Sequence, residues 1–257
     1  MKVTEYKPGT PCWVDLGSPD VAASIAFYTT VFGWTAHTSP YPAAGGYTIF
    51  HEGDSPVAGV GPLFTEGQPP AWSWYAATPD ADETARKVEA ANGKVLTTPF
   101  EVLDAGRMAI FLDVNGVPFA VWQAGQMIGA GIQREPGSLC WIELMTRNPE
   151  PAVEFYTKVL GWSAKPSTDP EMPYIELHID DDFFGGVMPM VGDQWPAELP
   201  DQWVVYFAVE DTDATCARVQ ELGGTVMVPP QEVPNVGRFA AVTDPQGAAF
   251  SVIRMAG

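Results

Sequence analysis

The sequence predicts an α+β protein in which four βαβββ modules form two tandem domains. The first observation is an internal repeat: Gly9–His37 matches Gly137–Lys165 without a gap and with 11 identities in 29 positions, where average composition gives about two. The second is a further match, between Thr84–Val121 and Thr215–Val252. The third is the order of the apolar patterns, because strand-like alternation and helix-like periods follow one another in the same order four times.

Each half is expected to begin with a short strand and a helix. The runs WVDL and WIEL alternate as half-buried strands do. A helix is predicted to begin behind Ser18-Pro19 in the first half and behind Asn148-Pro149 in the second, since a capping side chain before a proline marks a helix start. The expected boundaries are a first domain over residues 1–124, a linker over 125–136 and a second domain over 137–257.

The chain is strongly acidic, with 32 acidic and 13 basic residues and a formal net charge of -19. Such a field repels nucleic acid phosphates and anionic lipids. A membrane helix needs about 18 uninterrupted apolar residues, and no stretch of the sequence approaches that length. We therefore expect a cytoplasmic protein with no nucleic acid and no membrane among its partners. Cys12, Cys140 and Cys216 have no CxxC spacing and are expected to be buried thiols.

Two motifs occur once in each half. They are Phe27-Tyr28 with Gly33-Trp34, repeated as Phe155-Tyr156 with Gly161-Trp162, and Gly106-Arg107 with Asp113 and Gly116, repeated as Gly237-Arg238 with Asp244 and Gly247. Together they resemble the vicinal oxygen chelate superfamily, which includes glyoxalase I, bleomycin-resistance proteins and extradiol dioxygenases. In particular, the chain is similar to two-domain actinobacterial glyoxalase-like proteins that often carry the label hydroxylase.

The resemblance implies a fold and an assembly. In that family, two βαβββ modules form a curled mixed sheet around a cavity, with the helices on the outer face of the sheet. Single-domain relatives commonly dimerise, and a fused pair achieves the same within one chain. We therefore expect a monomer with an internal pseudo-dimer, or a weak homo-oligomer.

Metal-dependent members of the family carry His, Gln or Glu ligands on the concave face of the sheet. The resemblance places these positions at Trp13 and Trp141, at Ser73 and Val204, and at Ala120 and Ser251. A divalent transition metal needs three or four converging N, O or S ligands, and these positions do not supply them. We expect no metal and no cofactor.

Alternation within the first strand of each half marks cavity residues. It places Trp13 with Asp15, and Trp141 with Glu143, on the cavity face, and turns Cys12 and Cys140 toward the helix. The tryptophans either line the cavities or plug them. The carboxylates either act as hydrogen-bond acceptors or general bases, or pair with a cation in a structural salt bridge.

Further candidate ligand-binding residues are Tyr75, Tyr206, Trp122, Arg107, Arg238 and His178. The tyrosine hydroxyls bind or protonate a substrate oxygen, or the rings belong to the core. The arginines either bind an anionic ligand or form structural salt bridges that hold a loop in place. For Arg107 the expected salt-bridge partner is Asp104 or Asp113. His51 and His178, which match in the repeat, either face solvent or pair with the cavity carboxylate.

These residues favour a metal-independent protein of the bleomycin-resistance type, which binds an aromatic or polyketide-like metabolite in a concave cavity. One alternative is a metal-independent isomerase, cyclase or hydroxylase-like enzyme that uses Asp15 or Glu143 with Tyr75 or Tyr206. A second alternative is an atypical metal-dependent lyase or dioxygenase, which requires His51 or His178 in the cavity. Trp122 corresponds to Ile253, so the two cavities are expected to have diverged.

Overall fold

The computed structural model describes residues 1–65, 67–167, 173–193 and 195–256. The first half forms one mixed sheet in the order β2-β3-β4-β1-β5-β8-β7-β6. Its strands are β1 (Pro11–Ser18), β2 (Thr35–Thr38), β3 (Thr48–Glu52), β4 (Ser55–Pro62), β5 (Ala71–Ala77), β6 (Lys94–Val102), β7 (Gly106–Leu112) and β8 (Pro118–Ala124). Its helices are α1 (Val21–Phe32), α2 (Ala81–Ala90) and the short 3-10 helix η1 (Pro42–Ala44).

The second half repeats this order as β10-β11-β12-β9-β13-β16-β15-β14. Its strands are β9 (Leu139–Thr146), β10 (Ser163–Pro166), β11 (Ile175–Ile179), β12 (Asp182–Pro189), β13 (Gln202–Ala208), β14 (Thr225–Val233), β15 (Gly237–Thr243) and β16 (Ala249–Met255), and its helices are α3 (Pro149–Leu160) and α4 (Thr212–Glu221). Each sheet joins two modules through an antiparallel central pair, β1 with β5 and β9 with β13. The predicted α+β fold of four βαβββ modules is confirmed.

The first helix of each half starts at the same point of the repeat. The prediction for the second half is confirmed, because α3 begins at Pro149 after Asn148. The prediction for the first half is wrong by two residues. Asp20, not Ser18, caps α1, and its carboxylate accepts a backbone N–H bond of 3.0 Å from the first turn. The Ser18 hydroxyl instead accepts from the Asp20 backbone N–H at 3.0 Å.

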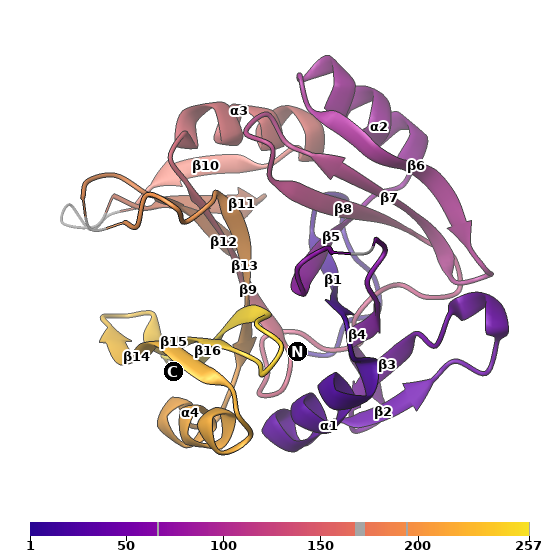
Figure 1. Cartoon of the computed structure of the whole chain (residues 1–257). Helices are drawn as coiled ribbons and strands as arrows, with labels where there is room; N and C mark the ends of the chain where they lie inside the picture. The colour runs from indigo at the N-terminus through magenta and orange to yellow at the C-terminus, as the bar shows by residue number, and fades with distance from the viewer. Residues whose placement is uncertain (66, 168–172, 194, 257) are drawn as a thin grey trace.

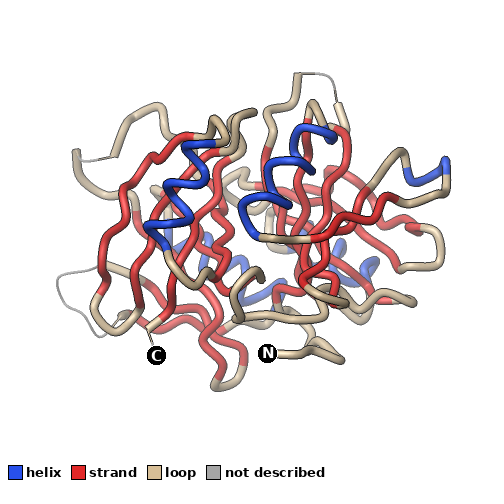
Figure 2. The backbone as a smooth tube through the Cα atoms, turned by 90° about the horizontal axis from the view of Figure 1, so that it is seen from below, coloured by secondary structure: helices blue, strands red, loops and turns tan. Residues whose placement is uncertain are grey.

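The two sheets lie back to back around one shared core (Figure 1). Helix α1 lies beside α4 and α2 beside α3, so each helix touches the other half of the chain (Figures 1 and 2). Trp74 on β5 contacts Trp162 and Trp203 of the second half, with ring centroids 5.6 and 5.0 Å apart. The helix-bearing faces of the sheets therefore point toward the other domain, and the concave faces point outward.

Buried hydrogen bonds join the two domains across this core. The Tyr28 hydroxyl donates to Asp244 Oδ2 at 3.1 Å and accepts from Trp72 Nε1 at 3.0 Å. The repeat makes the reciprocal contact, in which the Tyr156 hydroxyl donates to Asp113 Oδ2 at 3.1 Å. The tyrosine of one repeated motif thus binds the aspartate of the other motif in the opposite domain.

The tryptophans that follow the helices also cross between domains. Trp34 Nε1 donates to the Gly137 carbonyl at 2.8 Å, and Trp162 Nε1 donates to the Gly9 carbonyl at 2.9 Å. Both indoles are almost fully buried. The recurring Gly-Trp pairs therefore serve the domain interface and not the cavities.

The described helices are short. The longest, α1 and α3, have 12 residues each, whereas a helix that spans a bilayer needs about 20. Within the described ranges, no helix combines the length and the apolar character needed to cross a membrane.

The reciprocal tyrosine bonds predict a stability effect. Tyr28→Phe removes the hydroxyl that binds Asp244 and leaves that buried carboxylate with one partner fewer, so we expect a loss of about 1–3 kcal/mol in the free energy of unfolding. Urea denaturation followed by circular dichroism measures this loss. Tyr41 is 63% exposed, and Tyr41→Phe should leave the midpoint unchanged. Equal midpoints for both variants would show that the cross-domain bond contributes nothing.

Candidate functional site

Four side chains form a hydrogen-bonded network on the concave face of the first sheet. The Tyr47 hydroxyl accepts from Trp13 Nε1 at 3.0 Å and donates to Asp15 Oδ2 at 3.1 Å. The Tyr75 hydroxyl donates to the same oxygen at 3.0 Å. The carboxylate of Asp15 is therefore held between two phenols, and one of these phenols also holds the indole of Trp13.

The second sheet carries the same network. Trp141 Nε1 donates to the Tyr174 hydroxyl at 3.0 Å, and the Tyr206 hydroxyl donates to Glu143 Oε1 at 3.0 Å. Tyr174 also hydrogen-bonds the Glu143 carboxylate. The structure thus brings together the candidates Trp141, Glu143 and Tyr206, as it does Trp13, Asp15 and Tyr75.

Strand register explains why these residues meet. Trp13 lies opposite Tyr75 in the β1–β5 pairing. On the other side, β4 lies between β1 and β3, and Gly59 on β4 is opposite Asp15. A Cβ at Gly59 would collide with the Tyr47 hydroxyl, so the absence of a side chain there lets Tyr47 reach across β4 to the carboxylate.

Sequence reasoning missed the role of Tyr47 and Tyr174. The available signal was a tyrosine just before the third strand of each half, together with a glycine in the neighbouring strand, Gly59 or Gly186. This tyrosine lies only two strand spacings from the carboxylate, because the order is β3-β4-β1. A tyrosine side chain covers that distance when the intervening residue is glycine.

The environment of both carboxylates shifts their titration. Burial raises the pKa of Asp15 to about 6, against the opposing effect of the hydrogen bonds from Tyr75 and Tyr47. Burial likewise raises the pKa of Glu143, opposed by the bonds from Tyr206 and Tyr174. Each carboxyl group therefore exchanges protons closer to neutral pH than an exposed one does.

The first concave face is filled by its own side chains and by the linker. Trp13 is 4% exposed and Trp122 is 7% exposed, and both pack with Met108 and Ala130. Trp122 Nε1 donates to the Met127 carbonyl of the linker at 2.8 Å. In the first domain, both indoles are therefore buried and offer little ring surface to a ligand.

The second concave face is more open. Ile253 occupies the place of Trp122, and Phe239 occupies the place of Met108. Trp141, Val204 and Phe239 are only partly buried. An aromatic wall, a carboxylate and two phenols therefore border accessible space in this domain.

The two matching histidines have different surroundings. His178 Nε2 lies 3.1 Å from Glu176 Oε2, and its ring stacks on Phe183, which also contacts Trp141 edge-on. His51 instead packs against His37, with ring centroids 4.6 Å apart. His178 is thus linked to the cavity tryptophan through Phe183, and its carboxylate partner is Glu176 rather than Glu143.

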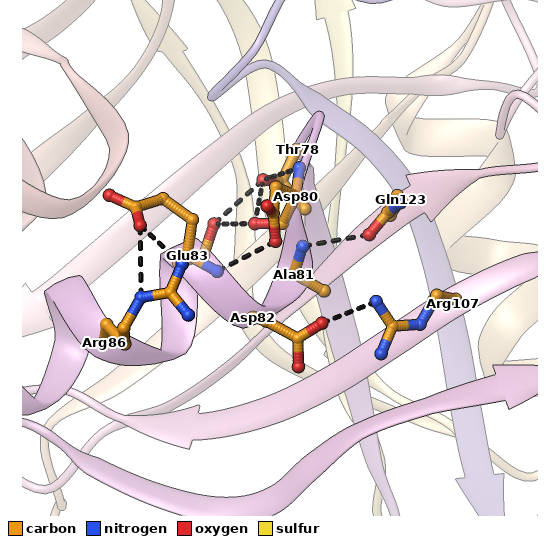
Figure 3. Close-up of polar contacts among 9 residues, drawn as sticks. Thr78, Asp80, Ala81, Asp82, Glu83, Arg86, Arg107 and Gln123 are labelled. Carbon is orange, nitrogen blue, oxygen red and sulfur yellow. Dashed lines mark hydrogen bonds and ion pairs between the residues drawn. The ribbon is translucent and has the colours of Figure 1, made fainter.

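The arginines lie on the helix-bearing faces. Arg107 Nη1 binds Asp82 Oδ2 of α2 at 2.7 Å (Figure 3), and Arg238 Nε binds Asp213 of α4 at 2.6 Å. Met108, the next residue in the strand, packs with Trp13 and Trp122 on the concave face. Arg107 therefore points to the opposite face of the sheet. A structural salt bridge was an expected alternative, but Asp104 and Asp113 were the wrong partners. The arginines are not part of the concave site.

Cys12 and Cys140 do not lie on the face of the sheet that strand alternation predicts. Cys12 and Cys140 pack with the concave clusters and not with the helices. A bulge in the β1–β5 pairing between Pro11 and Trp13 puts Cys12 out of the regular alternation. All three cysteines are buried free thiols, as expected.

The metal positions of the family can be tested against the side chains present. The indole of Trp13 fills the position in the first strand, and Ala120 faces Tyr75 at another. In the described part of the chain, no group of three or more His, Cys, Asp or Glu side chains could hold a metal ion. The residues at these positions do not fit a metal centre.

Comparisons with known proteins agree with this architecture. The model of the glyoxalase/bleomycin resistance protein/dioxygenase superfamily matches residues 12–121 and 138–252. CFP32 of Mycobacterium tuberculosis (strain CDC 1551 / Oshkosh), provisionally named a glyoxylase, is 40% identical over 99% of this chain and 98% of its own length. The anthracycline biosynthesis protein DnrV of Streptomyces peucetius is 42% identical over 98% of this chain and 96% of its own length.

Solved structures share the fold at low sequence identity. The Mn(II)-bound glyoxalase from Novosphingobium aromaticivorans is 18% identical, with a TM-score of 0.66 over 95% of this chain and 82% of that one. The 2,2',3-trihydroxybiphenyl 1,2-dioxygenase of Sphingomonas wittichii strain RW1 is 14% identical, with a TM-score of 0.66 over 96% and 91%. At these identities the similarity shows the fold alone.

The glycine under Tyr47 predicts a steric effect. Gly59→Ala places a methyl group where the Tyr47 hydroxyl lies, so we expect Tyr47 to be displaced and the free energy of unfolding to fall by about 1–3 kcal/mol. The control is the same substitution in a Tyr47→Ala background, where the methyl group has no ring to displace and should cost less than half as much. Equal costs in both backgrounds in urea denaturation would rule out this contact as the cause.

The raised pKa of Asp15 predicts a pH dependence. Because the folded pKa, about 6, exceeds the ordinary value of 3.8, ionised Asp15 opposes folding, and this opposition grows from about pH 4 to about pH 6. Asp15→Asn should therefore gain about 2–3 kcal/mol relative to wild type between pH 4 and pH 7.5. Urea denaturation at both pH values measures the gain. The exposed control Asp54→Asn should show less than about 0.5 kcal/mol, and a pH-independent difference for Asp15→Asn would contradict the assignment.

Proposed function

The chain belongs to the glyoxalase/bleomycin resistance protein/dioxygenase superfamily, and we propose that it binds an aromatic or polyketide-like small molecule on the concave face of its second domain, without a metal ion. The observation that carries the proposal is the network of Trp141, Tyr174, Glu143 and Tyr206 beside partly exposed apolar side chains. The names of DnrV and of DauV from Streptomyces sp. (strain C5), 42% identical, support a ligand of the aromatic polyketide class.

The chemistry of the site suits a flat ligand with oxygen substituents. Trp141 provides a broad ring surface that its bond to Tyr174 holds in one orientation. Glu143 accepts a hydrogen bond from a phenol when ionised and donates one to a quinone oxygen when protonated. Burial raises its pKa, which favours the protonated form more than in an exposed carboxyl group. The same group can thus orient either oxidation level of such a ligand.

A second candidate is a metal-independent isomerase or cyclase at the same site. The observation that favours it is the bond of 3.0 Å between Tyr206 and a Glu143 whose pKa burial raises. Glu143 would remove a proton next to a ligand carbonyl while Tyr206 binds the carbonyl oxygen, which is general acid–base catalysis without a redox step.

Binding of 1,4-dihydroxyanthraquinone tests the first candidate. Isothermal titration should show that Trp141→Leu weakens binding at least tenfold, because it removes the ring on which the ligand stacks. Trp13→Leu is the matched control, because its ring is buried in the first domain, and it should change the affinity less than twofold. Circular dichroism verifies that both variants are folded. Equal losses for the two variants, or no binding by the wild type, would refute the assignment to the second domain.

Glu143→Gln separates binding from catalysis. If the chain only binds, a candidate keto-substituted anthraquinone is recovered unchanged after incubation, as chromatography and mass spectrometry would show. If the chain is an isomerase or cyclase, an isomeric product of equal mass forms, and Glu143→Gln abolishes it while the affinity stays within about threefold. Asp15→Asn should leave product formation intact.

A further inference from the structure

A hollow of about 230 Å³ lies where the N-terminal segment meets the second domain. Leu139, Ile142 and Phe184 form part of its apolar wall, Val3 lines it from the N-terminal segment, and Trp141 also borders it. Trp141 therefore belongs both to the hollow and to the ligand network described above. Building on the proposed function, we propose that the hollow is the second half of the ligand site and receives a hydrogen-bond-donating side arm of an elongated aromatic ligand.

The first domain shows how the corresponding place is filled. There the linker passes over the start of β1 and β4, where Ala130 N–H donates to the Cys12 carbonyl at 2.8 Å and Gly131 N–H donates to the Pro56 carbonyl at 2.7 Å. The Cys12 carbonyl is available to the linker because the β1–β4 pairs begin only at Asp15. The linker thus satisfies two strand carbonyls with hydrogen-bond donors.

The second domain has an equivalent position at the start of β9 and β12. Cys140 corresponds to Cys12 in the repeat. Phe183 corresponds to Pro56, because Phe183 lies opposite His178 as Pro56 lies opposite His51. The Phe183 carbonyl accepts from Arg134 Nη2 at 3.1 Å. Cys140 lines the hollow, and its counterpart Cys12 turns its carbonyl toward the linker that fills the same place in the first domain. By the repeat, the Cys140 carbonyl faces the hollow. The carbonyl of Cys140 is the acceptor that a ligand donor would meet.

The path of the linker also indicates the shape of the ligand. In the first domain, Met127 packs on the concave cluster and Ala130 reaches the bulge three residues later. The same path in the second domain leads from Ile253 past Trp141 to Cys140. A ligand that follows it has an aromatic body on the concave face and an arm that ends in a hydroxyl or amine.

The charges at the rim agree with a donor arm. Arg134 is occupied by Asp182 at 2.8 Å, and Lys7 by Asp180 at 2.6 Å. Glu5 also borders the hollow, and the chain as a whole carries a net charge of -19. An anionic arm would meet cations that are already paired, whereas a donor meets the Glu5 carboxylate and a backbone carbonyl.

Three probes and two variants test the proposal. The probes are 1-aminoanthraquinone, 1-(propylamino)anthraquinone and 1-(3-hydroxypropylamino)anthraquinone, titrated calorimetrically into the wild-type chain. We expect the hydroxypropyl compound to bind at least fivefold more tightly than the propyl compound. Val3→Trp fills the hollow and should remove this advantage while 1-aminoanthraquinone keeps its affinity within twofold. Val3→Ala is the matched control and should preserve the advantage, since the Val3 backbone bond to Gly131 remains.

Each outcome decides between the two proposals. If the aromatic core binds but the terminal hydroxyl gives no advantage, or if Val3→Trp weakens all three probes equally, the hollow is not an arm site and only this inference falls. If none of the probes binds the folded wild-type chain, the proposed function and this inference both fall. A crystal structure with the hydroxypropyl compound should place its terminal oxygen within hydrogen-bond distance of the Cys140 carbonyl.

Discussion

The architecture depends on one buried aromatic core that belongs to both domains. Each sheet has a helix-bearing face rich in Phe, Tyr and Trp, and these two faces cover each other. Tyr28 and Tyr156 carry hydroxyls into this core, where unpaired polar groups are costly. Their partners, Asp244 and Asp113, come from the opposite domain. The domains are therefore fixed relative to each other by directional bonds as well as by apolar contact, and both concave faces are left pointing outward.

The same sheet geometry gives the two concave faces one chemical plan and two different surfaces. In both, a tyrosine crosses a glycine of the neighbouring strand to reach a carboxylate and an indole. The surroundings then differ, because the linker and Trp122 pack around Trp13 on the first face, while Ile253 in place of Trp122 leaves Trp141 partly exposed on the second. The polar network is thus present in both halves, but its indole is buried in the first half and partly exposed in the second.

The sequence predicted the fold well because the repeat reports the same strand and helix pattern twice. It also predicted the meeting of Trp13, Asp15 and Tyr75, since period-two alternation fixes the face of each strand residue. It did not reveal Tyr47, whose role depends on Gly59 in another strand, nor the helix start at Asp20. The role of Arg107 was ambiguous, because spacing within a motif does not say which face of the sheet a neighbouring helix covers.

The reciprocal tyrosine–aspartate bonds have a consequence for synthesis of the chain. Tyr28 and Asp244 are 216 residues apart, and at 5–20 residues per second a ribosome takes roughly 10 to 40 s to make the intervening segment. During this interval the aromatic face of the first sheet has no second sheet to cover it. The nascent first domain therefore exposes apolar surface until the second half has been made, and slow translation of the second half would prolong this exposure.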